Sequence, residues 1–284
     1  MAMSLGALYR YPVKSFRGED LQSADVEPWG LAGDRRWMVV DDAGRTITAR
    51  VISAMVLLRA EITESGLRLH APGVASIDVP RPDPSVQVPV SLWGSQLTAV
   101  PTDRDVAGWM CSVLGVGARL VWLDDPARRP TDQRYSDPGD RVSFADGFPL
   151  LLTSRTSLAA LNDAIPVSPG GGGALSMTRF RPNVVVEGAP AWAEDDWRRI
   201  RIGDATFRAV KGCARCVLTT VDPETAERGR EPLATLARTR RWDTRTWFGI
   251  NLIPNSAGET IHVGDEVEVL DSATPGGGPL RQPV

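Results

Sequence analysis

Apolar and polar residues alternate in short segments through most of the first hundred positions, which is the pattern of half-buried β-strands. The sequences DAG at 42–44 and ESG at 64–66 are of the kind that form turns between neighbouring strands. Strands at this spacing predict a sheet-rich sandwich or barrel. The predicted strands cover residues 4–12, 22–27, 36–41, 46–49, 57–62, 67–70, 76–79, 88–92 and 96–100.

A helical period replaces this alternation after residue 101. Apolar residues at positions 106, 109, 110 and 114 share one face of a helix predicted over 102–114, with Thr102 or Asp103 as its N-cap. Cys111 falls off that face and is interpreted as a structural thiol. Two further helices are predicted over 154–165, after a buried strand at 148–153, and over 231–239.

A polar, proline-rich segment at 124–140 separates two β-rich parts of the chain. The fold class is therefore mainly β (α+β), with a few short helices. We place an N-terminal β-barrel-like domain at 1–124, a second β-rich domain at 125–275 and a flexible tail at 276–284. The glycine-rich stretch 169–173 predicts a flexible insertion. The segments 200–202 and 205–210 predict a hairpin. The remaining strands are predicted at 118–123, 184–187, 217–221, 248–251, 261–263 and 266–270.

Composition and charge exclude several classes of protein. The net charge of −3 gives no global support for nucleic-acid binding. Three cysteines cannot form a secreted disulfide framework, and the N-terminus does not resemble a signal peptide. No run approaches the ~18 to 20 apolar residues of a membrane span. We therefore expect a cytoplasmic protein without membrane attachment. The two histidines, His70 and His262, lie in strand-like stretches, which argues against a Cys–His or Ser–His–Asp hydrolase.

Two of the three cysteines form a Cys-x-x-Cys pair, Cys213 and Cys216, with Arg215 between them. The following β-branched segment 217–221 predicts a strand, whereas a redox-active dithiol normally opens a helix. A four-cysteine zinc site needs a second pair, which the sequence lacks. A thiolate is a soft metal ligand, and a neighbouring guanidinium would lower the pKa of the thiol, so a metal site and a pair of buried core thiols both remain open.

The full segment KGCARCVLTTVDPETAERGREPL at 211–233 resembles the cysteine motif of the MOSC (molybdenum cofactor sulfurase C-terminal) domain. The similar branch contains the mitochondrial amidoxime-reducing component and its bacterial relatives. Further segments resemble that family in the same order: YPVKSFRG at 11–18, GLAGDRRWMVVDDAGRTITAR at 30–50, RFRPNVVVEG at 179–188, WRRIRIGDATFRAVKGC at 197–213 and FGINLIP at 248–254. The resemblance implies an N-terminal MOSC β-barrel followed by a MOSC β-barrel domain.

The resemblance implies that Cys216 ligates molybdenum and that Asp222, near the metal, delivers a proton or orders a water. It also implies that Lys14 and Ser15 contact the phosphate of the cofactor molybdopterin. Asn251 stands where animal members carry a tyrosine. The implied cofactor-binding residues are Lys14, Ser15, Arg35, Asp146, Ser154, Arg181, Asn183, Arg215 and Asn251. Simpler interpretations remain for several of them: a surface charge for Lys14, an ion pair with Asp34 for Arg35, helix capping for Ser154, and a turn residue for Asp222.

The implied function is a molybdenum-dependent oxidoreductase that reduces N-hydroxylated substrates. All three cysteines precede residue 217, so the chain has no four-cysteine iron–sulfur motif, and it has no Gly-x-Gly-x-x-Gly nucleotide signature. We therefore expect a separate electron donor, a ferredoxin, flavodoxin or heme protein with its reductase, which docks on the basic run at 238–241. Pyridoxal phosphate binding is a further property associated with the family. The alternatives are a sulfur carrier or cofactor-handling protein with a cysteine persulfide, and a non-catalytic binding barrel.

Overall fold

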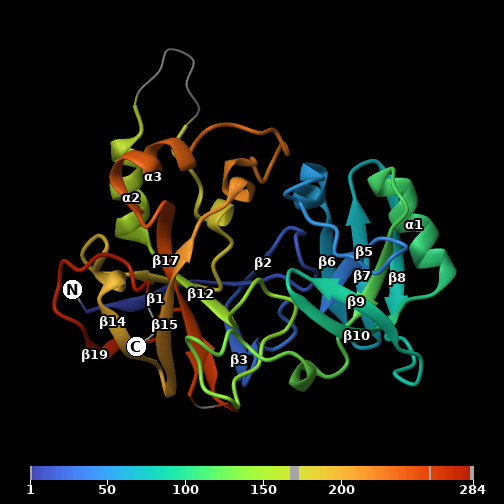
Figure 1. Ribbon diagram of the computed structural model, residues 1–284, viewed down its shortest axis with the longest axis horizontal. Helices are drawn as coiled ribbons and strands as arrows, with labels where there is room; N and C mark the ends of the chain where they lie inside the picture. Colours follow the sequence, from blue (N-terminus) through green and yellow to red (C-terminus); the bar gives the residue numbers. More distant parts are fainter. Residues whose placement is uncertain (1, 167–172, 256, 282–284) are drawn as a thin grey trace.

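The computed structural model describes residues 2–166, 173–255 and 257–281, and it consists of two lobes that lie side by side (Figure 1). Strands dominate both lobes, which confirms the predicted mainly β class. Three α-helices occur among the described residues: α1 (Arg104–Leu114), α2 (Arg155–Ala164) and α3 (Leu233–Thr239). None of the helices there is long and apolar enough to span a membrane.

A nine-stranded sheet forms the first lobe, in the order β19-β14-β15-β17-β12-β13-β1-β2, with β16 paired to β17. All its pairings are antiparallel except β12 with β13. Its inward side chains, such as Leu152, Phe207 and Ile250, are fully buried in one core. The strands are β1 (Ser4–Arg10), β2 (Glu19–Leu21), β12 (Leu150–Ser154), β13 (Val184–Glu187), β14 (Trp197–Ile202), β15 (Ala205–Ala214), β16 (Arg241–Trp242), β17 (Arg245–Pro254) and β19 (Val267–Ser272).

Two smaller sheets and α1 form the second lobe. One sheet has the order β5-β11-β10-β9 and the other β6-β7-β8. Asp103 caps α1 by accepting a hydrogen bond from the backbone N–H of Val106, as the sequence predicts. The strands are β5 (Trp37–Val40), β6 (Arg59–Thr63), β7 (Gly66–Ala71), β8 (Val74–Pro80), β9 (Val88–Leu92), β10 (Ser95–Pro101) and β11 (Arg119–Trp122).

The N-terminal segment belongs to the first lobe, although most of the predicted domain 1–124 forms the second. Strand β1 pairs with β13 and β2, and β3 (Ser23–Glu27) pairs with β4 (Gly30–Leu31) and with β18 (Thr260–His262). Between β1 and β2 the loop at 11–16 contacts both lobes, because Lys14 N donates to Trp37 O at 2.8 Å and Phe16 O accepts a hydrogen bond from Arg181 Nη1 at 2.6 Å. This loop is therefore placed at the junction of the lobes.

Two local predictions are wrong. Residues 217–220 form a 3-10 helix, η5 (Val217–Thr220), in place of a strand. The hydroxyls of Thr219 and Thr220 donate to backbone oxygens three residues earlier, at 2.9 and 2.8 Å, so local hydrogen bonds outweigh the β preference of these residues. Residues 46–49 form no strand among the described residues, where their one bridge joins Thr46 to Val40.

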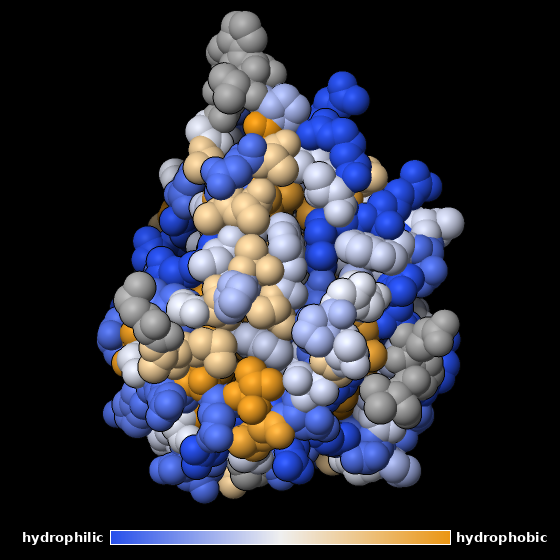
Figure 2. Space-filling view, turned by 90° about the vertical axis from the view of Figure 1, so that its left-hand side faces the viewer, coloured by the Kyte–Doolittle hydropathy of each residue, from blue (hydrophilic) through white to orange (hydrophobic). Residues whose placement is uncertain are grey.

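The outer face of the first lobe carries helices α2 and α3 at the top of Figure 1, above the sheet. Figure 2 shows this face: hydrophilic residues border it on both sides, and its hydrophobic residues are spread down the centre with one small group near the bottom. Part of the predicted tail packs against this lobe, because Leu280 is buried and its oxygen accepts a hydrogen bond from Gly212 N at 2.7 Å. The predicted insertion 169–173 lies almost entirely outside the described residues.

Candidate functional site

A pocket at the junction of the lobes collects most of the residues that the sequence singles out. It encloses about 770 Å³ of space that opens to solvent. The residues come from segments far apart in the chain, and the junction loop at 11–16 brings the first of them to β15 and β17. The predicted residues that line it are Lys14, Ser15, Arg35, Asp146, Arg181, Asn183, Arg215, Cys216 and Asn251; Arg50, Arg179, Cys213 and Thr219 also line it.

Lys14 lies at the inner wall of this pocket and is 6% exposed. Its Nζ donates to the backbone oxygen of Phe144 at 2.8 Å and pairs with Asp146 at 2.5 Å. Burial lowers the pKa of Lys14 to about 8, and the carboxylate of Asp146 offsets only part of that effect. The simpler interpretation of Lys14 as a surface charge is wrong. An anion beside this ammonium would stabilise its charged form.

Two arginines enclose the ring of Tyr11 from either side. The guanidinium carbon of Arg35 lies 4.4 Å and that of Arg181 4.2 Å from the ring centroid. Arg35 also pairs with Asp34 at 2.5 Å and donates to Asn183 Oδ1 at 2.9 Å. Arg35 therefore forms the expected ion pair with Asp34 and also lines the pocket. The ring of Tyr11 contacts the guanidinium groups of both arginines.

Three residues of the pocket have a left-handed backbone conformation without being glycine. The φ angles are 72° at Ser15, 47° at Arg35 and 54° at Arg181. Such residues cost of order 1–3 kcal/mol each and persist where the surrounding structure enforces them, as at ligand-binding sites. Hydrogen bonds from Arg35 N to Tyr11 O at 2.7 Å and from Arg181 N to Thr178 O at 3.1 Å hold two of them.

The two cysteines of the pair have different surroundings. Cys213 is the next-to-last residue of β15, and Arg215 Nη1 donates a hydrogen bond to its Sγ at 2.8 Å. Burial raises the pKa of the Cys213 thiol, and the charge of Arg215 offsets this in part. Cys216 precedes η5, and none of the hydrogen bonds seen among the described residues involves its thiol. The guanidinium predicted to act on the metal-binding thiol thus contacts its neighbour instead.

The residues of the pocket fit an anionic cofactor that carries a soft metal. Arg181 Nη2 and Arg215 Nε are buried and have no hydrogen-bond partner among the described residues, which is unusual for charged donors and indicates a missing acceptor. The cations Lys14, Arg35 and Arg181 converge with the thiol of Cys216. Over residues 2–166, 173–255 and 257–281 no three His, Cys, Asp or Glu side chains form a cluster that could hold a metal alone. Cys216 is consequently the candidate protein ligand.

Two predicted residues lie outside this lining. Ser154 is fully buried at the start of α2, and its Oγ contacts Thr156 Oγ1 at 2.7 Å. Asp222 forms a turn by accepting hydrogen bonds from the N–H groups of Glu224 and Thr225, at 2.8 and 3.2 Å, and it pairs with Arg179 at 2.5 Å. Asp222 therefore reaches the pocket only through Arg179, in agreement with its interpretation as a turn residue.

The sequence singled out neither Arg50 nor Arg179 individually, although both belong to segments that resemble the family. Arg50 pairs with the second oxygen of Asp146 at 2.7 Å. Asn251, in β17, donates to the backbone oxygens of Lys211 and Gly212 at 3.0 and 3.2 Å and so joins two strands beneath the pocket. A signal for the two arginines was available, because Arg50 ends and Arg179 begins a segment that resembles the family.

Comparisons with known proteins identify the family of this chain. Residues 2–117 match the MOSC N-terminal beta barrel domain, and residues 139–268 match the MOSC domain. The chain is 31% identical to mitochondrial amidoxime-reducing component 1 of Homo sapiens, over 94% of this chain and 83% of that protein. It is 35% identical to mitochondrial amidoxime reducing component 2 of Rattus norvegicus, over 93% of this chain and 82% of that protein. The chain therefore belongs to the family of MOSC-domain proteins, in the branch that contains the mitochondrial amidoxime-reducing components.

Proposed function

We propose that this protein is a molybdenum-cofactor-dependent oxidoreductase that reduces N-hydroxylated compounds. The observation that carries the proposal is the convergence of Lys14, Arg35 and Arg181 on the pocket that Cys216 lines. The names of the relatives support the substrate class, since both relatives are amidoxime-reducing components. In the overall reaction two electrons and two protons convert an N–OH group into N–H and release water.

Each side chain has a defined part in holding the cofactor. Lys14 and Ser15 bind its phosphate from the junction loop, and Arg35, Arg181 and Asn183 orient the pterin. The thiolate of Cys216 is the protein ligand to molybdenum. When bound, the cofactor supplies two-electron redox chemistry for cleavage of the N–O bond. Asp222 acts through its ion pair with Arg179, which lines the pocket, and so positions that guanidinium.

The electrons come from a separate protein in this proposal. The sequence has three cysteines, fewer than the four that a two-iron centre requires. We propose a ferredoxin, flavodoxin or heme protein, with its reductase, as the donor, and the cytoplasm as the compartment. The basic run at 238–241 contributes less to docking than its sequence suggests, because Arg240 is only 8% exposed and pairs with Asp195, whereas Arg238 and Arg241 remain exposed.

Metal analysis and turnover test this function together. The purified protein should contain molybdenum and pterin near one equivalent each, and it should reduce benzamidoxime when a donor protein, its reductase and a reduced nicotinamide are present. Reduced nicotinamide alone should support no turnover. Labile sulfur in place of molybdenum, with no turnover from any donor or from a chemical reductant, would instead identify a sulfur carrier.

A further inference from the structure

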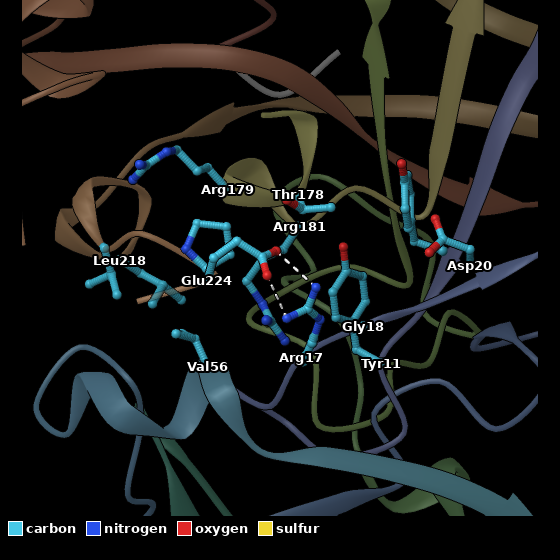
Figure 3. Close-up of a pocket in the computed structure, with 13 residues that line it drawn as sticks. Tyr11, Arg17, Gly18, Asp20, Val56, Thr178, Arg179, Arg181, Leu218 and Glu224 are labelled. Carbon is cyan, nitrogen blue, oxygen red and sulfur yellow. Dashed lines mark hydrogen bonds and ion pairs between the residues drawn. The ribbon is translucent and has the colours of Figure 1, made fainter. Parts of the chain in front are cut away.

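A second pocket lies next to the candidate cofactor site and is shown in Figure 3. It encloses about 550 Å³ of space that is partly open to solvent. Arg179, Arg181 and Leu218 line both pockets, so these three side chains form a shared wall. Leu218 belongs to η5, which begins directly after Cys216. The second pocket is therefore adjacent to the place where the proposed chemistry occurs.

Apolar side chains from both lobes form one side of this second pocket. In Figure 3, Val56 points into it from the 3-10 helix η1 (Ser53–Leu57), and Leu218 enters from the other lobe. Val221 and Pro223 extend the same apolar surface. The other side chains of the lining are mostly polar, so the pocket has an apolar part that can hold the body of a ligand and polar groups that can orient it.

The lining of the second pocket also contains polar groups without partners. The Tyr11 hydroxyl is buried and has no hydrogen-bond partner among the described residues, and the same holds for Arg181 Nη2. Tyr11 is 2% exposed, and burial raises the pKa of its hydroxyl well above the ordinary value, so it is a neutral donor. The unpaired Tyr11 hydroxyl indicates that a hydrogen-bond acceptor belongs beside it, and Arg181 Nη2 lies in the wall that this pocket shares with the cofactor site. Gly18 packs on the same ring, where an added Cβ would lie 2.4 Å from Tyr11 Cε1.

An exposed ion pair crosses this pocket between segments far apart in the sequence. Arg17 donates two hydrogen bonds to Glu224, at 2.9 and 2.8 Å, as the dashed lines in Figure 3 mark. Their side chains are 40% and 62% exposed. Exposed pairs of this kind stabilise weakly and exchange readily with water. The ion pair can therefore separate and admit a ligand without loss of the fold.

We propose that this pocket binds the non-reacting part of the substrate, and that this part is an aryl group bearing a carbonyl-type acceptor. The aryl group packs on Val56 and Leu218, and the acceptor faces Tyr11 and Arg181. Because the pocket shares a wall with the cofactor site, a substrate held here directs its N–OH group past Leu218 toward Cys216. This inference rests on the proposed function for its substrate class and adds the structural basis of selectivity.

The experiment compares substrates with and without an aryl body. Thr178 lines the second pocket and not the first, and it is partly exposed, so Thr178→Trp fills the space while leaving the cofactor wall intact. Hydroxylamine has no aryl group and serves as the reference substrate, whereas benzamidoxime carries a phenyl ring. In Thr178→Trp the ratio of kcat/KM for benzamidoxime to kcat/KM for hydroxylamine should fall at least tenfold. The matched control is Val116→Trp, at a 43% exposed position beyond α1, which should keep the ratio.

A second variant tests the acceptor and does not depend on how the tryptophan is tolerated. Tyr11→Phe keeps the ring between Arg35 and Arg181 and removes only the hydroxyl. It should lower the ratio of kcat/KM for the 3- or 4-carboxamide of benzamidoxime to kcat/KM for benzamidoxime at least fivefold, because only the carboxamide offers an acceptor to this hydroxyl. Equal effects on both compounds, together with an unchanged ratio in Thr178→Trp, would overturn the proposal.

Calorimetric titration without an electron donor separates this proposal from the function. No turnover occurs under that condition, so the dissociation constant of benzamidoxime reports the pocket directly. If benzamidoxime binds Thr178→Trp tenfold more weakly than it binds wild type and Val116→Trp, the pocket is supported. This conclusion holds even if wild type reduces neither substrate, because the lack of turnover would refute only the proposed function. Equal binding to all three proteins would refute the pocket while active wild-type protein upheld the function.

Discussion

Arg215 Nη1 donates a hydrogen bond to the Sγ of Cys213 at 2.8 Å and thereby separates the roles of the two cysteines. The second guanidinium nitrogen, Nη2, donates to Phe180 O at 2.7 Å. Arg215 thus links the end of β15 to η3 (Met177–Phe180), which directly precedes Arg181. Both cysteines line the pocket, but only Cys213 supports this link, since none of the hydrogen bonds among the described residues involves the thiol of Cys216.

The two cysteines should differ in metal retention. Cys216→Ser should lose at least nine-tenths of the molybdenum that wild type carries, because the soft ligand is removed. Cys213→Ser should retain the metal and lose stability modestly, by about 1 kcal/mol, since it weakens one hydrogen bond. Elemental analysis and chemical denaturation measure these effects. Equal metal loss in both variants would point to a dithiol site.

Cofactor retention should depend on the cations of the pocket. Arg181→Ala and Lys14→Ala each remove a charge-assisted contact worth about 1.5–3 kcal/mol, which corresponds to roughly 10- to 150-fold weaker binding. Pterin content after prolonged dialysis measures the loss. Arg199→Ala removes an exposed guanidinium from β14 and is the matched control, with full retention expected. Full pterin content in both pocket variants would place the cofactor elsewhere.

The pH dependence of stability should report a buried acid near α2. Glu194 is fully buried, and its Oε2 accepts a hydrogen bond from Ser157 Oγ at 2.8 Å. Burial raises the pKa of Glu194 to about 7 from the ordinary 4.5, so the folded state holds a proton that the unfolded state releases between these values. The contribution of protonated Glu194 to the free energy of unfolding is complete below about pH 4.5, and it is lost as the pH rises through about 7.

Glu194→Gln should abolish this dependence. Its free energy of unfolding should exceed that of wild type by about 3 kcal/mol at pH 8 and match it near pH 5, because the amide cannot ionise. Urea denaturation at several pH values between 4.5 and 8 provides the measurement. A difference that does not vary with pH would show that Glu194 does not titrate in this range.

A buried ion pair should be far more important for stability than an exposed one. Arg240 pairs with Asp195, their side chains are 9% and 6% exposed, and the guanidinium carbon lies 4.3 Å from the ring centroid of Trp192. Arg240→Ala should cost about 3–5 kcal/mol, since it leaves a buried carboxylate without its partner. Arg201→Ala breaks an ion pair with Glu268 that is 47% exposed on both sides, and it should change stability by less than about 1 kcal/mol. Thermal denaturation distinguishes the two cases.

Local patterning alone predicts most of the elements in this chain. The helical spacing at 106–114 and Asp103 as its cap correspond to α1, and the hairpin through Gly203 corresponds to β14 and β15. These features follow from hydrogen bonds and apolar faces within a few residues, so neighbouring residue types suffice to predict them. The same applies to the resemblance of the cysteine motif, because a motif is itself a local pattern.

The tertiary structure decided which of these residues meet and what each contacts. Tyr11 contacts both Arg35 and Arg181, which the whole second lobe separates in sequence, because β1 pairs with β13 and leads into the junction loop. Arg215 contacts Cys213 and not Cys216 because the chain turns into η5 after β15. Residue type and spacing contain no information on such long-range pairings, which depend on sheet order and on the burial of side chains from distant segments.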